Sequence, residues 1–152
     1  MNLIQVDTAN RRQVRQFLEL PFRLYQGWPQ WVPPLAPEAR RYLDRRRHPF
    51  YQHSDAAFFL VVDGNGQPIG RIGVLDNANY NAFNKERTAF FYLFECEDHR
   101  EAAQVLFDAA FHWARSRGLD KMIGPKGFSA LDGMGLLVKG FEHRPAFGIP
   151  YN

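Results

Sequence analysis

The chain has 152 residues, enough for one domain with a buried core, and its hydrophobic content of 45% excludes a disordered protein. Its net charge of +3 is uneven, because residues 1–54 carry nine arginines against four acidic residues, whereas acidic residues are in excess over residues 55–152. A single cysteine excludes an internal disulfide, and no apolar stretch is long enough to span a bilayer, so we expect a cytoplasmic protein with no membrane partner.

The first predicted element is a short strand from Leu3 to Val6. Asp7 and Thr8 follow it, and either is suited to cap a helix. Apolar residues then recur at helical spacing on one face, and these are Val14, Phe17, Leu18, Phe22 and Tyr25. Pro21 lies inside this pattern and lacks a backbone N–H, so we expect it to kink or end the helix near Leu20.

An extended segment and a basic helix are expected next. The sequence WPQWVPPL (28–35) holds three prolines, which favour an extended chain. A helix is predicted from about Pro37 to Arg47, ended by His48-Pro49-Phe50-Tyr51. It carries the main basic cluster, which consists of Arg40, Arg41, Arg45, Arg46 and Arg47. Such a cluster attracts anions or nucleic acid, but a solvated helical face is the commoner explanation, so we expect no specific nucleic-acid binding.

A β-hairpin is predicted at the centre of the chain. Residues 56–62 are apolar almost throughout, and the following DGNG sequence (63–66) is a strong turn signal. Residues 69–75 combine isoleucine, valine and leucine with glycine and Arg71, which fits the returning strand. The segment 77–87 carries four asparagines and is predicted to be a loop.

A strand, a helix and a second strand follow. Residues 89–96 form an apolar, aromatic-rich run of strand length. Asp98 is the predicted cap of the next helix, with Glu101 completing a capping box and Gly118 ending the helix. Residues 121–123 restart a short strand. A strand–helix–strand unit predicts two parallel strands joined by a right-handed crossover.

The remainder of the chain is rich in glycine. The loop GPKGFSALDGMG (124–135) follows the end of a parallel strand, where α/β sheets commonly bind ligands, and it brings Lys126, Ser129 and Asp132. Glycine-rich loops also occur simply to make turns, and both interpretations stay open. The loop is not a Walker A motif, since the GK[ST] ending is absent.

The order of these elements, β-α-α-β-β-β-α-β, resembles the Gcn5-related N-acetyltransferase (GNAT) fold. Several short motifs resemble an uncharacterised bacterial family of tandem GNAT-like proteins, and they are WVPPL (31–35), HPFY (48–51), GRIG (70–73), FFYLFE (90–95), GP (124–125), GLLVKGF (135–141) and PYN (150–152). The resemblance implies an α+β fold with a mixed, mostly antiparallel sheet and one parallel β-α-β pair. It also implies that this chain is a single GNAT-like domain (1–152), the first half of a longer two-domain protein, with the closing hairpin of the fold missing here.

The resemblance implies acetyl-CoA or another acyl-CoA as the cofactor. A GNAT domain usually holds the pyrophosphate on a glycine-containing loop at the start of the long helix. Here residues 95–101 read ECEDHRE and contain no glycine. Carboxylates at this helix end stabilise the helix but repel a diphosphate, so we expect poor CoA binding there.

The resemblance also nominates site residues. Glu95 stands where GNAT enzymes often place the carboxylate that takes the proton of the amine, and it is the candidate catalytic base. The alternative is a glutamate at the end of a strand that pairs with Arg71 or with a helix terminus. The candidate substrate-binding residues are Arg71, Lys126, Ser129 and Asp132. Cys96 is expected to be a core or strand-edge residue rather than a nucleophile. His48 and His53 are expected to serve packing or capping, since no histidine spacing resembles a metal site.

Two functional hypotheses follow from different classes. The first is a GNAT-type N-acyltransferase domain that acts on an unknown small-molecule amine in the full-length protein. The second is a catalytically silent GNAT-like module that binds substrate or packs against a C-terminal GNAT-like half, without a CoA site of its own. A third, nucleic-acid or anion binding by the arginine cluster, has the weakest support.

Overall fold

A five-stranded sheet in the order β1-β2-β3-β4-β5 forms the centre of the computed structural model, which describes residues 1–34 and 36–145. The PYN motif (150–152) lies outside the described residues. The strands are β1 (Asn2–Gln5), β2 (Asp55–Val62), β3 (Pro68–Asp76), β4 (Thr88–Cys96) and β5 (Lys121–Ile123). The first four pair antiparallel in succession, and β5 runs parallel to β4, so the predicted hairpin and the predicted parallel pair are confirmed.

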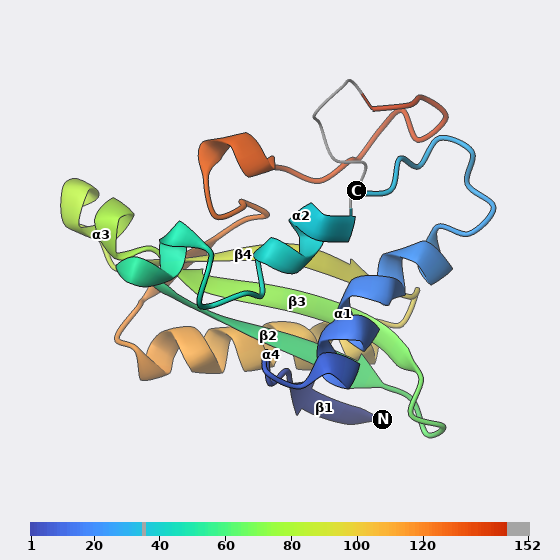
Figure 1. Ribbon diagram of the computed structural model, residues 1–152, viewed down its shortest axis with the longest axis horizontal. Coiled ribbons are helices and arrows are strands. Elements are labelled where there is room, and N and C mark those ends of the chain that lie inside the picture. The colour runs from blue at the N-terminus through green and yellow to red at the C-terminus, as the bar shows by residue number, and fades with distance from the viewer. Residues whose placement is uncertain (35, 146–152) are drawn as a thin grey trace.

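Two helices cover opposite faces of this sheet (Figure 1). α1 (Arg11–Leu24) packs on one face and α4 (Arg100–Ser116) on the other. Successive side chains of β2 alternate between them, because a strand directs neighbouring residues to opposite faces. Phe58 and Leu60 belong to the core cluster that contains Phe17 of α1, whereas Phe59 and Val61 belong to the cluster that contains Leu106 of α4. The chain therefore has two apolar layers with the sheet between them.

Small residues bring α4 close to β3. The buried residues of α4 are Ala102, Leu106, Ala110 and Ala114, so three of the four are alanines. On the strand, a Cβ atom added to Gly70 would lie 2.8 Å from Cδ1 of Leu106 and 2.9 Å from Sγ of Cys96. The glycine of β3 is required here because the helix leaves no room for a side chain.

α1 extends through Pro21 to Leu24, so of the two effects expected of Pro21, a kink or an end near Leu20, the end is wrong. Proline removes the N–H that would bond to the carbonyl four residues earlier, which here belongs to Phe17. Nη1 of Arg71 donates to that carbonyl oxygen at 2.7 Å. A guanidinium from β3 thus satisfies the acceptor that Pro21 leaves open, and the helix continues.

Both long helices begin with a different cap from the one predicted. Asn10, rather than Asp7 or Thr8, accepts the N–H groups at the start of α1, because Asp7 instead accepts the N–H of Ala9 in the preceding turn. His99, rather than Asp98, caps α4 by accepting the N–H of Ala102 on Nδ1. The reason lies in the sheet, since the N–H of Glu97 still bonds to the carbonyl of Ile69 and delays the helix.

Two of the predicted connecting elements also differ. The basic helix α2 spans only Ala36–Arg41. Residues 42–47, which were predicted to continue it, lie outside the helix. The asparagine-rich segment is not a loop but contains α3 (Ala78–Asn84), which Asn77 caps. Lys85, in the left-handed conformation with φ of 54°, ends that helix. Asparagines therefore cap and line a short helix here rather than form turns.

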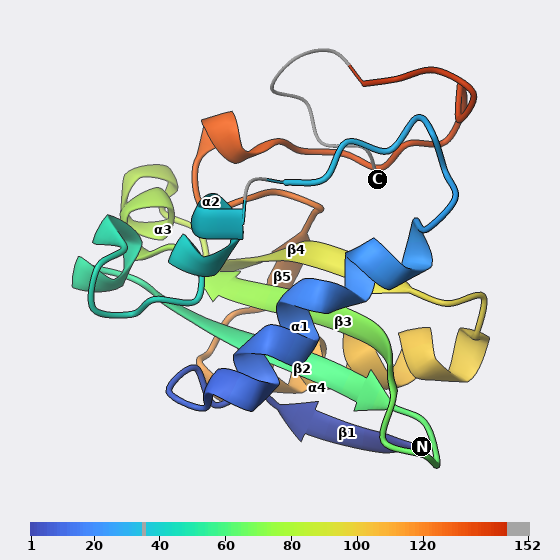
Figure 2. The ribbon, with the colours of Figure 1, turned by 45° about the vertical axis from the view of Figure 1, so that its right-hand side comes forward.

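The segments before β2 and after β5 meet on the α1 face of the sheet. The first contains a 3₁₀ turn, η1 (Pro49–Gln52), and the second contains another, η2 (Ala130–Asp132). Figure 2 shows the chain after β5 turning back toward α2. Within the described residues no further strand pairs with β5, so the closing hairpin of the GNAT fold is not present in this part of the chain.

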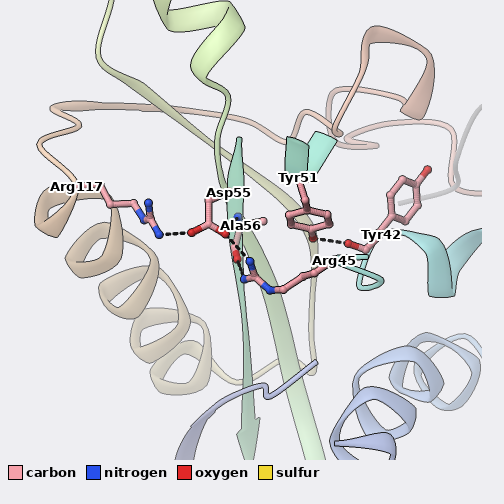
Figure 3. Close-up of polar contacts among 6 residues, drawn as sticks. All are labelled: Tyr42, Arg45, Tyr51, Asp55, Ala56 and Arg117. Carbon is pink, nitrogen blue, oxygen red and sulfur yellow. Dashed lines mark hydrogen bonds and ion pairs between the residues drawn. The ribbon is translucent and has the colours of Figure 1, made fainter. Parts of the chain in front are cut away.

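An ion-pair network fastens the segment before β2 to the C-terminal end of α4 (Figure 3). One oxygen of Asp55 accepts from Arg45 at 2.5 Å, and the other accepts from Arg117. Arg45 also donates to the carbonyl of Ala56. Burial alone would raise the pKa of Asp55, but the hydrogen bond from Arg45 and the charges of both arginines lower it overall. Arg45 is therefore part of a structural bridge, not of an open basic face.

No helix in the described ranges combines the length and the apolar composition that crossing a membrane requires.

The Asp55 network gives a pH-dependent prediction. We expect Asp55→Asn to lower the free energy of unfolding at pH 7 by about 1–2 kcal/mol, since two partly exposed ion pairs are lost. Because the pKa of Asp55 is lowered in the folded state, its contribution is present above the unfolded value, about 3.9, and disappears as the pH falls through the folded value. Urea unfolding at pH 7 and at pH 3 measures both effects, with Asp98→Asn as the control. An equal loss at the two pH values would contradict it.

Candidate functional site

A bulge in β4 shapes the candidate site. Gly73 lies opposite Tyr92 and Arg71 lies opposite Glu95, so two steps along β3 match three along β4. The extra residue in this interval leaves Leu93 with φ of 53°. As a result Tyr92 and Glu95, three positions apart, both lie on the α1 face of the sheet. The bulge thus places a phenol and a carboxylate on the same surface.

The candidate base Glu95 is held by Arg71. The two side chains form an ion pair and a hydrogen bond, with side-chain exposures of 5% for Arg71 and 10% for Glu95. The same guanidinium donates to the carbonyl of Phe17 and lies 4.9 Å from the centre of its ring. The alternative expected for Glu95, pairing with Arg71, is the arrangement seen. The role of Glu95 in catalysis stays a prediction.

Asp132 organises the loop after β5. Its carboxylate accepts the N–H of Ser129, and the Ser129 hydroxyl accepts the N–H of Leu131 at 3.2 Å. The same carboxylate accepts the hydroxyl of Tyr42 at 2.9 Å, and the carbonyl of Asp132 accepts the hydroxyl of Tyr92. Two predicted substrate-binding residues, Ser129 and Asp132, are therefore brought together, and tyrosines from two other segments fasten them to the sheet.

Tyr92 stays a hydrogen-bond donor under physiological conditions. Burial raises the pKa of its hydroxyl to about 12, and the neighbouring charges of Asp132 and Glu95 act in the same direction. The hydroxyl therefore holds its proton and its bond to the loop.

An aromatic cluster surrounds His48 beside this loop. The ring of Phe128 lies 5.1 Å from that of His48, 5.0 Å from that of Tyr42 and 4.8 Å from that of Phe50. Nδ1 of His48 accepts the N–H of Phe50 at 3.3 Å, which matches the expected capping role. Burial lowers the pKa of His48; Arg41 acts in the same direction and Asp132 opposes it. The imidazole is therefore neutral at pH 7, with its proton on Nε2.

A cavity of about 400 Å³ opens beside His48. Its half-buried lining side chains are His48, Asn77 and Asp132, and its apolar wall contains the buried rings of Phe50 and Phe128. Arg41 and Ser129 are exposed at its rim. The cavity therefore presents one carboxylate, neutral hydrogen-bond donors and an apolar wall.

The other two predicted binding residues lie apart from this cavity. Arg71 is 4% exposed and is engaged with Glu95 and Phe17. Nζ of Lys126 lies 4.1 Å from the centre of the Phe90 ring and 4.7 Å from that of the Tyr80 ring. Lys126 and these two aromatic residues do not line the cavity. Of the four residues nominated for substrate binding, only Ser129 and Asp132 reach it.

The start of α4 does not fit a diphosphate. His99 accepts the N–H of Ala102, so one of the free N–H groups is already occupied. Glu97 is paired with Arg23 at 2.6 Å, and Glu101 adds a carboxylate in the first turn. The residues at this helix end therefore provide no glycine cradle for the pyrophosphate of CoA, and the carboxylate of Glu101 opposes its charge.

Cys96 is half-buried among residues that pack under α4, as expected for a core position. Burial raises the pKa of its thiol, and the charge of Glu97 raises it further, so the thiol stays protonated. No group of three histidine, cysteine or acidic side chains within residues 1–34 and 36–145 is arranged to hold a metal ion.

Sequence reasoning missed several residues of this site. Tyr42 and Tyr92 were not distinguished from core aromatics, because a strand or helix pattern does not reveal which hydroxyl meets a distant loop. His48 was assigned to packing and capping, which it does, but its position on the cavity was not foreseen. The HPFY motif was the available signal, since a proline is favoured at the first position of a helical turn and the residue before it stands at the cap.

Comparison with curated proteins gives two relatives. No protein-family model matches the chain. A bacterial ceramide synthase of Caulobacter vibrioides (strain NA1000 / CB15N) is 33% identical over 146 residues, which are 95% of this chain and 37% of that protein. Protein YghO of Escherichia coli (strain K12) is 29% identical over 143 residues, 93% of this chain and 36% of that protein. The chain thus spans little more than a third of the length of these relatives.

Solved structures show the fold. A tandem GNAT protein from the clavulanic acid biosynthesis pathway superposes with a TM-score of 0.60 and 18% identity, covering 76% of this chain and 33% of that one. An acetyltransferase of the GNAT family from Staphylococcus aureus Mu50 superposes with a TM-score of 0.56 and 15% identity, covering 82% of this chain and 72% of that one. The chain has the GNAT fold, and the predicted fold class is confirmed.

The buried ion pair gives a prediction about stability. We expect Arg71→Met to lower the free energy of unfolding by about 3–5 kcal/mol, because it leaves the carboxylate of Glu95 buried without its partner. The substitution also removes the donor to the Phe17 carbonyl, which lowers the free energy of unfolding by about 1–3 kcal/mol more. Urea unfolding monitored by circular dichroism measures the loss.

A second substitution separates these two causes. Pro21→Ala restores an N–H four residues after Phe17, so in the Arg71→Met background it is expected to recover about 1 kcal/mol. In the otherwise unmodified chain the same Pro21→Ala is expected to gain less, because Arg71 already serves the carbonyl. Equal effects of Pro21→Ala in both backgrounds would show that Arg71 does not replace the missing helical bond.

Proposed function

We propose that this chain is the acceptor-binding GNAT-fold domain of a longer, acyl-CoA-dependent N-acyltransferase. The observation that carries the proposal is the cavity beside His48 and Asp132, one wall of which is joined to β4 by the hydrogen bond from Tyr92 to the carbonyl of Asp132. The acceptor amine lies in this cavity, and the acyl donor approaches along β4. A C-terminal GNAT-like half is the expected partner in the longer protein.

The edge of β4 supports this assignment. β5 pairs with β4 only as far as Phe90, and the N–H of Lys126 bonds to the carbonyl of Phe91 just beyond it. From Tyr92 onward no described strand pairs with that edge, so its N–H and C=O groups are open to a ligand. The GNAT fold admits its acyl donor where the fourth and fifth strands separate, and the short pairing of β4 with β5 supports the same position for the donor here.

The relatives support the chemistry. One is named a bacterial ceramide synthase, and the synthesis of a ceramide joins an acyl group to an amine through an amide bond. Acetyltransferases and a coenzyme A complex of an aminoglycoside acetyltransferase occur among the proteins with this fold. Acyl transfer from a CoA thioester to an amine is the reaction that is common to these observations.

The chain's own residues account for part of this reaction. Asp132 attracts the ammonium form of the amine through its charge, and the apolar wall of Phe50 and Phe128 strengthens that attraction by excluding water. Glu95, the candidate base, is paired with Arg71 and does not line this cavity, so binding of the amine is the part of the reaction for which the cavity accounts. The diphosphate of CoA does not fit at α4, so we place its binding in another part of the longer protein.

The activity test uses the longer natural protein. With an acyl-CoA and an amine acceptor, we expect release of free CoA, detected with a thiol reagent, together with an amide product detected by mass spectrometry. His48→Asn is expected to reduce kcat/KM for the amine at least tenfold while the KM for acyl-CoA stays within about twofold, because the cavity holds only the acceptor. His112→Asn, exposed on α4, is the matched control.

Two results would contradict the proposal. Absence of amide formation with a broad set of amines would exclude acyl transfer. Full activity of His48→Asn would show that the domain does not bind the acceptor, and the silent packing module would then be the better description.

The isolated chain gives a separate prediction. Because the start of α4 carries carboxylates and a histidine cap, acetyl-CoA is expected to bind with millimolar affinity or weaker. At about 0.1 mM such a ligand adds less than about 0.1 kcal/mol to stability, so the melting temperature stays unchanged. Thermal unfolding with and without acetyl-CoA tests this. A rise of several degrees that free CoA competes away would place a working CoA site in this chain.

A further inference from the structure

The side chains of the cavity beside His48 also indicate the charge and the polar groups of its ligand. Its half-buried side chains, His48, Asn77 and Asp132, hold a single formal charge, which is the negative charge of Asp132. The one arginine on the cavity, Arg41, is exposed at the rim. A ligand that complements the interior therefore has one positive charge and neutral polar groups.

Asp132 has the capacity to take the positive charge. Its two carboxylate oxygens accept one hydrogen bond each, from the hydroxyl of Tyr42 and from the N–H of Ser129. A carboxylate has about four acceptor positions, so a lone pair stays open on each oxygen. Among the described side chains no cation pairs with Asp132. An ammonium group fits this position.

His48 and Asn77 offer neutral donors beside it. Because Nδ1 of His48 accepts the N–H of Phe50, the proton of the neutral ring resides on Nε2, for which no described residue provides an acceptor. Oδ1 of Asn77 accepts the N–H of Tyr80 at 3.0 Å, which leaves its Nδ2–H groups as donors. Two uncharged donors suit the oxygen of a hydroxyl group. A carboxylate on the ligand would instead be matched by a cation in the site.

We propose that this cavity binds the head of an amino alcohol, with the ammonium on Asp132 and a neighbouring hydroxyl oxygen on Nε2–H of His48 and Nδ2–H of Asn77. The inference rests on the proposed function in taking the amine as the acyl acceptor, but it concerns binding alone. The buried rings of Phe50 and Phe128 form the apolar wall against which the carbon skeleton of the ligand packs. The same histidine cannot also accept the proton of the amine at Nε2, because that nitrogen already carries one.

A set of three-carbon ligands tests the proposal on the unmodified chain. The ligand 2-amino-1,3-propanediol carries both groups, isopropylamine lacks the hydroxyls, and glycerol replaces the amine with a hydroxyl. Titrations followed by two-dimensional ¹H–¹⁵N NMR give the dissociation constants. We expect millimolar binding of the amino diol, since so small a ligand makes few contacts, and binding at least about tenfold weaker for the other two.

The binding constants of this series either support or contradict each proposed contact. Equal binding of isopropylamine would show that no hydroxyl is recognised, and equal binding of glycerol would show that no ammonium is. Serine, which adds a carboxylate, is expected to bind more weakly than the amino diol; tighter binding of serine would indicate a site for amino acids, with Arg41 as the anion partner. Each of these results overturns the proposal, as does the absence of any saturable shift.

Two substitutions locate the contact without removing the caps. His48→Asn keeps a side-chain oxygen for the N–H of Phe50, and Asn77→Ser keeps one for the N–H of Tyr80. In each variant the shorter side chain withdraws the proposed donor from the position of the ligand. Each is expected to weaken the amino diol about fivefold and to leave isopropylamine unchanged. His112→Asn on the opposite face serves as control. If a variant does not fold, the ligand series on the unmodified chain still decides.

This test is independent of acyl transfer. Amino-alcohol binding without activity in the longer protein would remove the proposed function and keep the site. Acyl transfer to amines by the longer protein, with no preference of this cavity for the amino diol, would keep the proposed function and remove this inference.

Discussion

The arrangement of the domain depends on one buried guanidinium. Arg71 of β3 joins the carboxylate of Glu95 on β4 and the carbonyl of Phe17 in α1, and it lies against the ring of Phe17. An arginine in an apolar layer is costly to desolvate unless its charge is paired and its N–H groups have acceptors. Here Glu95 supplies the opposite charge, and the carbonyl of Phe17 is a vacant acceptor, because Pro21 has no N–H to donate to the carbonyl four residues before it. The pair thereby fixes α1 across the bulged part of β4.

The candidate site is built on the same face by a second set of contacts. Tyr92 precedes the bulge and bonds to the backbone of Asp132, while Tyr42 reaches the carboxylate of the same residue. The glycine-rich loop is therefore held by two tyrosines from different segments. In addition, a Cβ atom added to Gly127 would lie 2.3 Å from Cβ of Asp132, so the loop requires glycine at that position to close on itself. The result is a rigid wall for the cavity beside His48, made without any contribution from α4.

The two ends of the domain thus have different chemistry. On the α1 face, a cavity with a carboxylate and neutral donors is suited to a small cation. At the start of α4, where the GNAT fold usually holds a pyrophosphate, the helix is closed by His99 and surrounded by acidic side chains, one of them paired with Arg23. The described chain has the first five strands of the fold but not its phosphate cradle. This supports our proposal that the acceptor amine and the acyl donor are held by different parts of a longer protein.

The sequence by itself determined the sheet, the two covering helices and the acidic start of α4. Apolar periods, the DGNG turn and the strand–helix–strand order are local signals, and they depend on neighbours only a few residues away. The tertiary structure alone decided that α1 continues through Pro21, since the group that replaces the missing N–H comes from Arg71, fifty residues later. It also decided that α4 starts at Arg100, because the N–H of Glu97 stays in the sheet, and that Asp132 meets Tyr42 and Tyr92. Such contacts join positions with no shared periodicity, so no local pattern contains them.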